Sequence, residues 1–163
     1  MSKLMSQKCE YGLRTLLELT SRQGTGPVPV SEIAINQAIP QRFLELIMKE
    51  LREAGAVRSH RGAKGGYTLA GDPKNLTVGW IVRLLDGSLN PMDCTSCGGD
   101  RLCAMHEECV FAELWRQAEA ALSGVYDSVC FAELHRRRHG NGDVKAAGKS
   151  RDDPPARSGT ARA

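Results

Sequence analysis

The sequence of 163 residues predicts a mostly α-helical protein with one short β-hairpin. Three observations lead to this prediction. Apolar residues recur at three- and four-residue steps in several stretches between residues 6 and 137, which is the spacing of amphipathic helices. Residues 56–69 instead form two short strand-like stretches around a glycine-rich turn. Residues 93–115 hold four closely spaced cysteines and lead into another helical stretch.

Three helices are expected in the first third of the chain. The first covers residues 6–22 and ends at a break that contains glycine and proline. The second is short and has Ser31 as its N-cap, and a turn at residues 36–40 leads to the third. Pro40 suits the first position of the third helix, which Gly55 ends as a C-terminal cap. The expected core stripes are Cys9, Leu13, Leu16, Leu17 and Thr20 on the first helix and Phe43, Leu44, Ile47, Met48 and Leu51 on the third.

The second and third helices, joined by a turn, have the proportions of a helix-turn-helix. Behind them, residues 56–59 and 67–69 are expected to pair as the strands of a hairpin. This hairpin is basic, and residues 54–71 contain no acidic residue. A glycine-rich basic hairpin can be an ordinary solvated turn, but its place behind a helix-turn-helix predicts a DNA-binding wing. Residues 1–88 are therefore expected to form a winged helix-turn-helix DNA-binding domain.

Six side chains are expected to contact DNA. Those on the hairpin should meet phosphates or the minor groove, and those on the third helix should face base edges in the major groove. They are Arg58, Arg61 and Lys64 on the hairpin and Gln41, Arg42 and Glu45 on the third helix.

Three more helices are expected after the hairpin. A fourth helix covers residues 76–87 with Thr77 as its N-cap, and it is followed by a long helix over 107–124 and a last one over 126–137. The apolar stripe of the long helix is too wide and too aromatic for one small domain to cover. We therefore expect residues 109–137 to supply a dimerisation helix and a C-terminal helix, the former packing on its copy in a second subunit. The expected interface residues are Leu114, Trp115, Ala118 and Leu122.

Four cysteines, separated by two, five and five residues, lie within or beside a predicted loop at residues 89–108. Thiolates are soft ligands that suit iron–sulfur clusters or zinc. The pattern lacks the paired C-x2-C knuckles common in zinc sites, which favours an iron–sulfur cluster over zinc. A metal-free thiol switch, in which Cys94 and Cys97 or another pair form a disulfide, is a third alternative. The four cysteines are Cys94, Cys97, Cys103 and Cys109.

Charge and composition narrow the function classes. The net charge is +3, but residues 1–135 carry −2 and residues 136–163 carry +5, so DNA binding by the folded part needs a local basic patch. Residues 138–163 are expected to form a disordered basic tail. No apolar run is long enough to span a membrane and no secretory signal is visible, so a cytoplasmic protein is expected. The sequence contains no nucleotide-binding loop, no G-x-S-x-G motif and no candidate acid–base pair, so nothing in it predicts an enzyme. An iron–sulfur electron carrier is the alternative to a regulator.

Three stretches together resemble the Rrf2 family of bacterial winged-helix regulators: CEYGLRTLLEL, IPQRFLELIMKELREAGAVRSHRGAKGGYTLA and the C-x5-C-x5-C loop. The resemblance covers about residues 4–135 and is strongest over Ile39–Leu69, where Arg61–Leu69 match the wing pattern RG-x-x-GGY-x-L. It implies a homodimer that binds operator DNA, and we expect repression. Many members hold an iron–sulfur cluster, [2Fe–2S] or [4Fe–4S], that senses redox state, nitric oxide or iron–sulfur status, and others lack it.

The resemblance also implies which residues hold the cluster. Ala112 replaces a histidine that some members have three residues after the last cysteine. Other members take a carboxylate from the first helix of the partner subunit, and Glu10 occupies that position. The fourth ligand is therefore Glu10, Cys94 or His106, although pairing with Arg14 is the simpler role for Glu10. The cysteines that match the ligand spacing of the family are Cys97, Cys103 and Cys109.

Overall fold

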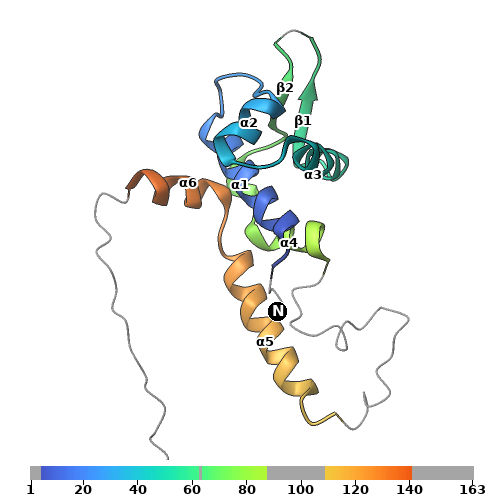
Figure 1. Cartoon of the computed structure of the whole chain (residues 1–163). Helices are drawn as coiled ribbons and strands as arrows, with labels where there is room; N and C mark the ends of the chain where they lie inside the picture. The colour runs from blue at the N-terminus through green and yellow to red at the C-terminus, as the bar shows by residue number, and fades with distance from the viewer. Residues whose placement is uncertain (1–4, 63, 88–108, 141–163) are drawn as a thin grey trace, which may run out of the picture.

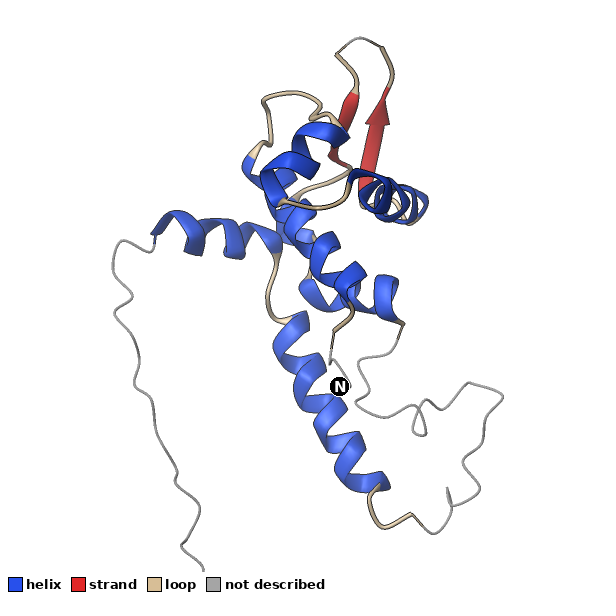
Figure 2. Cartoon of the chain, in the orientation of Figure 1, coloured by secondary structure: helices blue, strands red, loops and turns tan. Residues whose placement is uncertain are grey.

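The computed structural model of the protein describes residues 5–62, 64–87 and 109–140 (Figure 1). Within them two strands pair as one antiparallel hairpin and the other regular elements are helical, as Figure 2 shows, so the predicted mostly α-helical fold is confirmed. None of the described helices is long and apolar enough to cross a membrane. The elements in chain order are α1 (Gln7–Ser21), α2 (Val30–Gln37), α3 (Gln41–Glu53), β1 (Val57–His60), β2 (Gly66–Leu69), the 3-10 helix η1 (Pro73–Asn75), α4 (Val78–Asp86), α5 (Ala112–Asp127) and α6 (Phe131–Gly140).

Helix α1 is the element on which the rest of the winged domain packs, since it contacts α2, α3, α4, α6 and β2. Ser6 is its N-cap, and the Ser6 hydroxyl accepts a hydrogen bond from the Cys9 amide at 3.0 Å. Cys9, Leu16 and Thr20 of the predicted stripe are buried, whereas Leu13 and Leu17 are half-buried, so the stripe is confirmed in part. Burial, together with the nearby Asp86 carboxylate, raises the pKa of the Cys9 thiol to about 12. This thiol therefore stays protonated at neutral pH.

Helices α2 and α3 form the helix-turn-helix. Between them Ala38 adopts the left-handed conformation (φ 51°), and the amide of the buried Ile39 donates to a carbonyl of α2 at 2.9 Å. The N-terminal boundaries of α2 and α3 differ from the prediction. Pro29, not Ser31, is the N-cap of α2, and Pro40 is the N-cap of α3 rather than its first helical residue. Each proline has no N–H to satisfy, and its carbonyl accepts the first helical amides.

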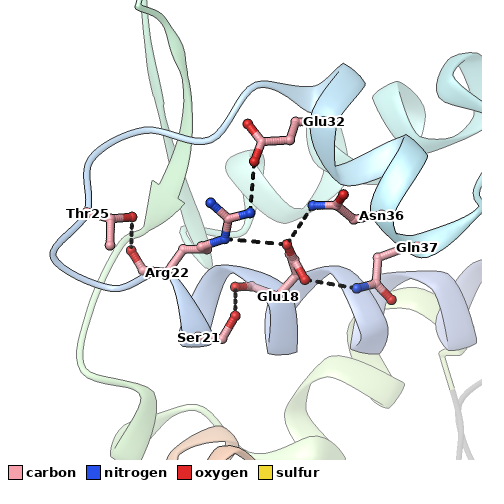
Figure 3. Close-up of polar contacts among 7 residues, drawn as sticks. All are labelled: Glu18, Ser21, Arg22, Thr25, Glu32, Asn36 and Gln37. Atoms are coloured by element: carbon pink, nitrogen blue, oxygen red, sulfur yellow. Dashed lines mark hydrogen bonds and ion pairs between the residues drawn. The ribbon is translucent and has the colours of Figure 1, made fainter.

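A buried carboxylate holds α2 on α1. Glu18 of α1 accepts hydrogen bonds from Asn36 Nδ2 and Gln37 Nε2 of α2, both at 3.0 Å (Figure 3). The Nε atom of Arg22 lies 3.7 Å from the same carboxylate, and its Nη2 atom pairs with Glu32 of α2 at 2.8 Å. A buried charge requires hydrogen-bonding partners, so these contacts favour one orientation of α2 relative to α1.

Helices α5 and α6 both begin and end later than predicted. Helix α5 covers Ala112–Asp127 rather than 107–124, and α6 covers Phe131–Gly140 rather than 126–137. Helix α6 thus includes the first three residues of the segment expected to be a disordered tail. The remainder of that segment and the whole predicted cysteine loop lie outside the described residues.

Backbone pairing between distant segments sets the break between α5 and α6. The Val78 amide donates to the Val129 carbonyl at 2.9 Å, and the Phe131 amide donates to the Leu76 carbonyl at 3.0 Å. These bonds, which flank an isolated bridge between Thr77 and Cys130, require an extended backbone just before α6. Because they join segments about fifty residues apart, helical periodicity alone does not reveal them.

Helix α5 points away from the winged domain in Figure 1, and none of its residues is buried. Its last turn is held to α4 by Arg83, whose guanidinium donates to both carboxylate oxygens of Asp127 at 2.7 and 2.6 Å. These bonds lower the pKa of Asp127 and raise that of Arg83. Gly79 of α4 leaves room for the contact, because a Cβ atom there would run into the Asp127 carboxylate.

Replacing Glu18 with alanine is expected to lower the free energy of unfolding by about 1.5–3 kcal/mol, because two hydrogen bonds to a buried carboxylate are lost. Urea denaturation followed by circular dichroism measures this. The matched control is Glu10→Ala on the same helix, where the carboxylate is 47% exposed and 3.8 Å from Arg14. That change should cost less than about 0.5 kcal/mol. Equal losses in the two variants would contradict the role given to Glu18.

Candidate nucleic-acid interface and cysteine site

Helix α3 presents a polar face opposite its buried stripe. The buried stripe agrees with the prediction, except for half-buried Phe43, and consists of Leu44, Ile47, Met48 and Leu51. Gln41, Arg42 and Glu45, the residues predicted to meet base edges, are all exposed. Gln41 Nε2 donates to Glu45 Oε1 at 3.0 Å, so two of the three form a hydrogen-bonded pair. All three lie in the first half of α3, the part of a recognition helix that meets base edges.

The hairpin holds the three predicted wing cations in solvent. Strands β1 and β2 pair within one residue of the predicted positions. Arg58 lies on β1, Arg61 and Lys64 lie in the turn, and all three side chains are exposed. The turn is closed by Gly62, which adopts φ 107° and accepts a hydrogen bond from the Gly65 amide at 2.9 Å. Among the described residues, no carboxylate pairs with these three cations.

A third stretch of backbone anchors the wing. The Val28 amide donates to the Tyr67 carbonyl at 3.0 Å, and the Tyr67 amide donates back to Val28 at 2.8 Å. The neighbouring Gly66 has φ 156°, and a Cβ atom at this position would run into the Val28 backbone. Sequence reasoning missed this contact, because Val28 lies between two prolines and shows no strand-like alternation. The contact fixes β2 to the segment that leads into α2.

Exposed apolar side chains lie on α5 and at its N-cap, Phe111. Phe111 and Leu114 are 56% and 53% exposed, and the rings of Phe111 and Trp115 lie 6.3 Å apart. Of the predicted interface residues, Leu114 is exposed, whereas Trp115, Ala118 and Leu122 are half-buried. An apolar surface on a helix that projects from the fold suits contact with another protein surface.

Cys109 is the one spacing-matched cysteine within the described part of the chain. It is half-buried, and its carbonyl accepts a hydrogen bond from the amide of Ala112, the first residue of α5, at 3.1 Å. A partly accessible thiol suits an iron–sulfur cluster or zinc, so Cys109 fits the predicted group, whereas the fully buried Cys9 does not. No three metal-binding side chains come together among the described residues. The other candidate ligands of the loop lie outside them: Cys94, Cys97, Cys103 and His106.

Glu10, the candidate ligand from the first helix, pairs with Arg14 at 3.8 Å. Arg14 also donates to the side-chain oxygen of Gln37 at 3.4 Å and to the Gln37 carbonyl at the end of α2. The simpler role of Glu10, an ion pair on α1, is thus observed. Its role as a ligand stays a prediction.

Comparison with known proteins agrees with this arrangement. Residues 5–137 match the family model of Rrf2, described as an iron-dependent transcriptional regulator. The HTH-type transcriptional regulator CymR of Bacillus subtilis is 35% identical over 130 residues, which are 80% of this chain and 88% of that protein. The HTH-type transcriptional regulator IscR of Klebsiella pneumoniae is 32% identical over 130 residues, 80% of this chain and 78% of that protein. The solved structure of T. potens IscR matches with a TM-score of 0.69 and 30% identity, over 87% of this chain and 93% of that one.

Replacing Gly66 with alanine is expected to lower the free energy of unfolding by about 1–3 kcal/mol, because the added methyl group forces the wing away from the Val28 backbone. Thermal and urea unfolding measure this. Gly71→Ala is the matched control, since a Cβ atom at Gly71 meets nothing within 4 Å. We expect a change of less than about 0.5 kcal/mol there. A Gly66 variant as stable as the Gly71 variant would contradict the role of the Val28 backbone as an anchor of the wing.

Proposed function

Because the chain belongs to the Rrf2 family of DNA-binding transcriptional regulators, we propose that it is a homodimeric cytoplasmic repressor whose operator affinity depends on an iron–sulfur cluster. One observation supports the DNA-binding arrangement: the hairpin packs beside α3, its three cations are exposed with no carboxylate partner among the described residues, and the polar residues of α3 are exposed too (Figure 1). The wing can then contact phosphates while α3 reads base edges, a division of roles that most DNA-binding proteins share.

The exposed surface of helix α5 supports the proposal that the protein is a dimer. This helix has no buried residue, and its exposed apolar side chains include Leu114 and Val125. In a two-fold dimer the same face of each subunit meets its copy, which removes these side chains from water. Because α5 projects away from the winged domain, α3 and the wing remain open to DNA in each subunit. A two-fold dimer of this kind requires a palindromic operator.

The cluster would be held by the three spacing-matched cysteines, with Glu10, Cys94 or His106 as the fourth ligand. The iron-dependent description of the family and the accessible thiol of Cys109 support this assignment. When bound, a [2Fe–2S] or [4Fe–4S] cluster supplies a centre that reacts with oxidants and nitric oxide. Zinc and a metal-free thiol switch would use the same cysteines and are the alternatives.

The position of Cys109 explains how a bound group would change DNA affinity. Cys109 stands three residues before α5, so ligand bonds to its sulfur restrain the start of the proposed dimer helix. The other end of that helix is held to α4 through Arg83 and Asp127. Operator affinity depends on the spacing of the two winged domains. Gain or loss of the ligand bonds at the start of α5 would change this spacing and therefore the operator affinity. A coupling of about 1–3 kcal/mol corresponds to a change of about 5–150-fold.

Lys64→Ala tests the role of the wing. We expect weaker binding to all DNA sequences alike and a slope of log affinity against log salt that is flatter by about one unit, because one phosphate contact is lost. Fluorescence anisotropy with labelled duplexes at several salt concentrations measures both quantities. Arg137→Ala on α6 is the control, since it also removes one exposed cation but lies outside the wing. A Lys64 variant with altered sequence preference and an unchanged salt slope would contradict the phosphate contact.

Cys103→Ala tests the cluster. Wild-type protein purified without oxygen is expected to absorb visible light, and the variant should lose this absorbance and change operator affinity by about 5–150-fold. It should remain dimeric in size-exclusion chromatography. Cys130→Ala, which removes a cysteine outside the loop, should keep both the colour and the affinity.

The alternatives give different results in the same experiment. A colourless wild type that contains zinc supports the zinc alternative, and a metal-free protein whose affinity follows oxidation supports the thiol switch. A coloured protein that binds no DNA supports an electron carrier. The sensor function is excluded if the Cys103 variant binds the operator as tightly as the iron-loaded wild type does.

A further inference from the structure

Leu46 is an apolar residue on the outward face of α3. Its side chain is 60% exposed, whereas Leu44, Ile47 and Met48 on either side of it in the sequence have no exposure. Leu46 therefore does not belong to the core stripe of α3. A single exposed leucine is common on protein surfaces, so its significance depends on its neighbours.

Two of the residues next to Leu46 on the helix surface are cations, and a third, Glu50 four residues after it, is a carboxylate that pairs with Lys8 of α1. Arg42 stands four residues before it and Lys49 three residues after it, which are the spacings of adjacent positions on a helix face. Both cations are exposed. Leu46 thus lies within the surface that is proposed to enter the major groove, between two groups that can reach phosphates or guanine.

Two of the three carboxylates of α3 are in ion pairs, whereas Glu45 keeps its negative charge beside a neutral amide. Glu45 accepts a hydrogen bond from Gln41 at 3.0 Å, Glu50 pairs with Lys8 of α1 at 3.1 Å, and Glu53 lies 4.0 Å from Lys49. The wing beside α3 adds exposed cations that no carboxylate pairs with in the described part of the chain. The wing thus supplies the positive charge that makes this side of the molecule complementary to a polyanion.

Base edges in the major groove offer one apolar group, the C5 methyl group of thymine. A leucine side chain has no hydrogen-bonding atom, so it gains free energy there only by covering that methyl group. Opposite cytosine it would cover an amino group and leave it without a partner. We propose that Leu46 is a specificity-determining residue that packs on the C5 methyl group of one thymine in each operator half-site. This rests on the proposed function, because it requires α3 to lie in the major groove.

The test begins with an operator selected by the wild-type protein from random duplex DNA. Each thymine is then replaced singly by deoxyuridine, which lacks only the methyl group, and affinities are measured by fluorescence anisotropy. At one thymine in each half-site, the replacement should weaken wild-type binding about fourfold, which corresponds to about 0.8 kcal/mol for one buried methyl group. Leu46→Ala should bind the thymine and deoxyuridine duplexes equally.

Two further variants make the test specific. Ile35→Ala removes another exposed apolar side chain, 80% exposed on α2, and should retain the full sensitivity to deoxyuridine. Leu46→Gln adds hydrogen-bonding groups at the same position and should shift the preferred base from thymine towards adenine, which glutamine can read through two hydrogen bonds.

The outcomes separate this proposal from the one on which it rests. A wild-type protein that selects no DNA overturns both. A selected operator whose affinity is unchanged by every deoxyuridine replacement overturns the role of Leu46 alone. So does a Leu46→Ala variant that keeps the fourfold sensitivity, or one whose oligomeric state changes, since Leu46 would then belong to a protein interface.

Discussion

The buried carboxylate of Glu18 is the constraint on which the geometry of the helix-turn-helix depends. It is the only buried carboxylate among the described residues, and its partners Asn36 and Gln37 are the last two residues of α2. The turn to α3 follows immediately, with Ile39 buried, so the direction of α3 depends on where α2 ends. Apolar packing is not directional, so it would hold α2 on α1 without fixing the rotation of α2 about its own axis. Hydrogen bonds to a carboxylate are directional and therefore fix this rotation.

Helix α1 also connects the helix-turn-helix with the segment that precedes the cysteine loop. Asp86, the last residue of α4, accepts hydrogen bonds from the amide of Ser6, at 2.8 Å, and from its hydroxyl group. Ser6 caps the start of α1, and Glu18 lies near the end of the same helix. A rigid helix with specific contacts at both ends is the kind of physical connection through which two distant sites can be coupled. The contacts at Ser6 and Arg83 thus make α4 the element that joins α1 to α5.

Local sequence patterns were sufficient to predict the elements of the winged domain, but not the contacts that orient them. Periodicity identified α1, α3 and α4, and the basic glycine-rich turn identified the wing, because these signals lie within about fifteen residues. The bridge from Val28 to Tyr67 and the pairing near Cys130 join distant segments, so no local pattern contains them. At the candidate interface, the charged and amide residues of α3 and the wing were predicted from polarity. Leu46, the residue proposed to contact thymine, was in neither the predicted core stripe nor the predicted DNA contacts, because those contacts were chosen by polarity.

Net charge is a poor guide to the partner of this chain, and the contacts show why. Residues 1–135 carry −2, which by itself argues against a polyanionic ligand. Several of their carboxylates are already paired: Glu18 and Glu32 share Arg22, and Glu50 holds Lys8. The cations of the wing have no such partners among the described residues. The resulting field is uneven, with a positive wing on a body of net negative charge, and a field of this kind orients the protein as it approaches DNA. Local pairing of charges, rather than their sum, therefore determines which face can meet DNA.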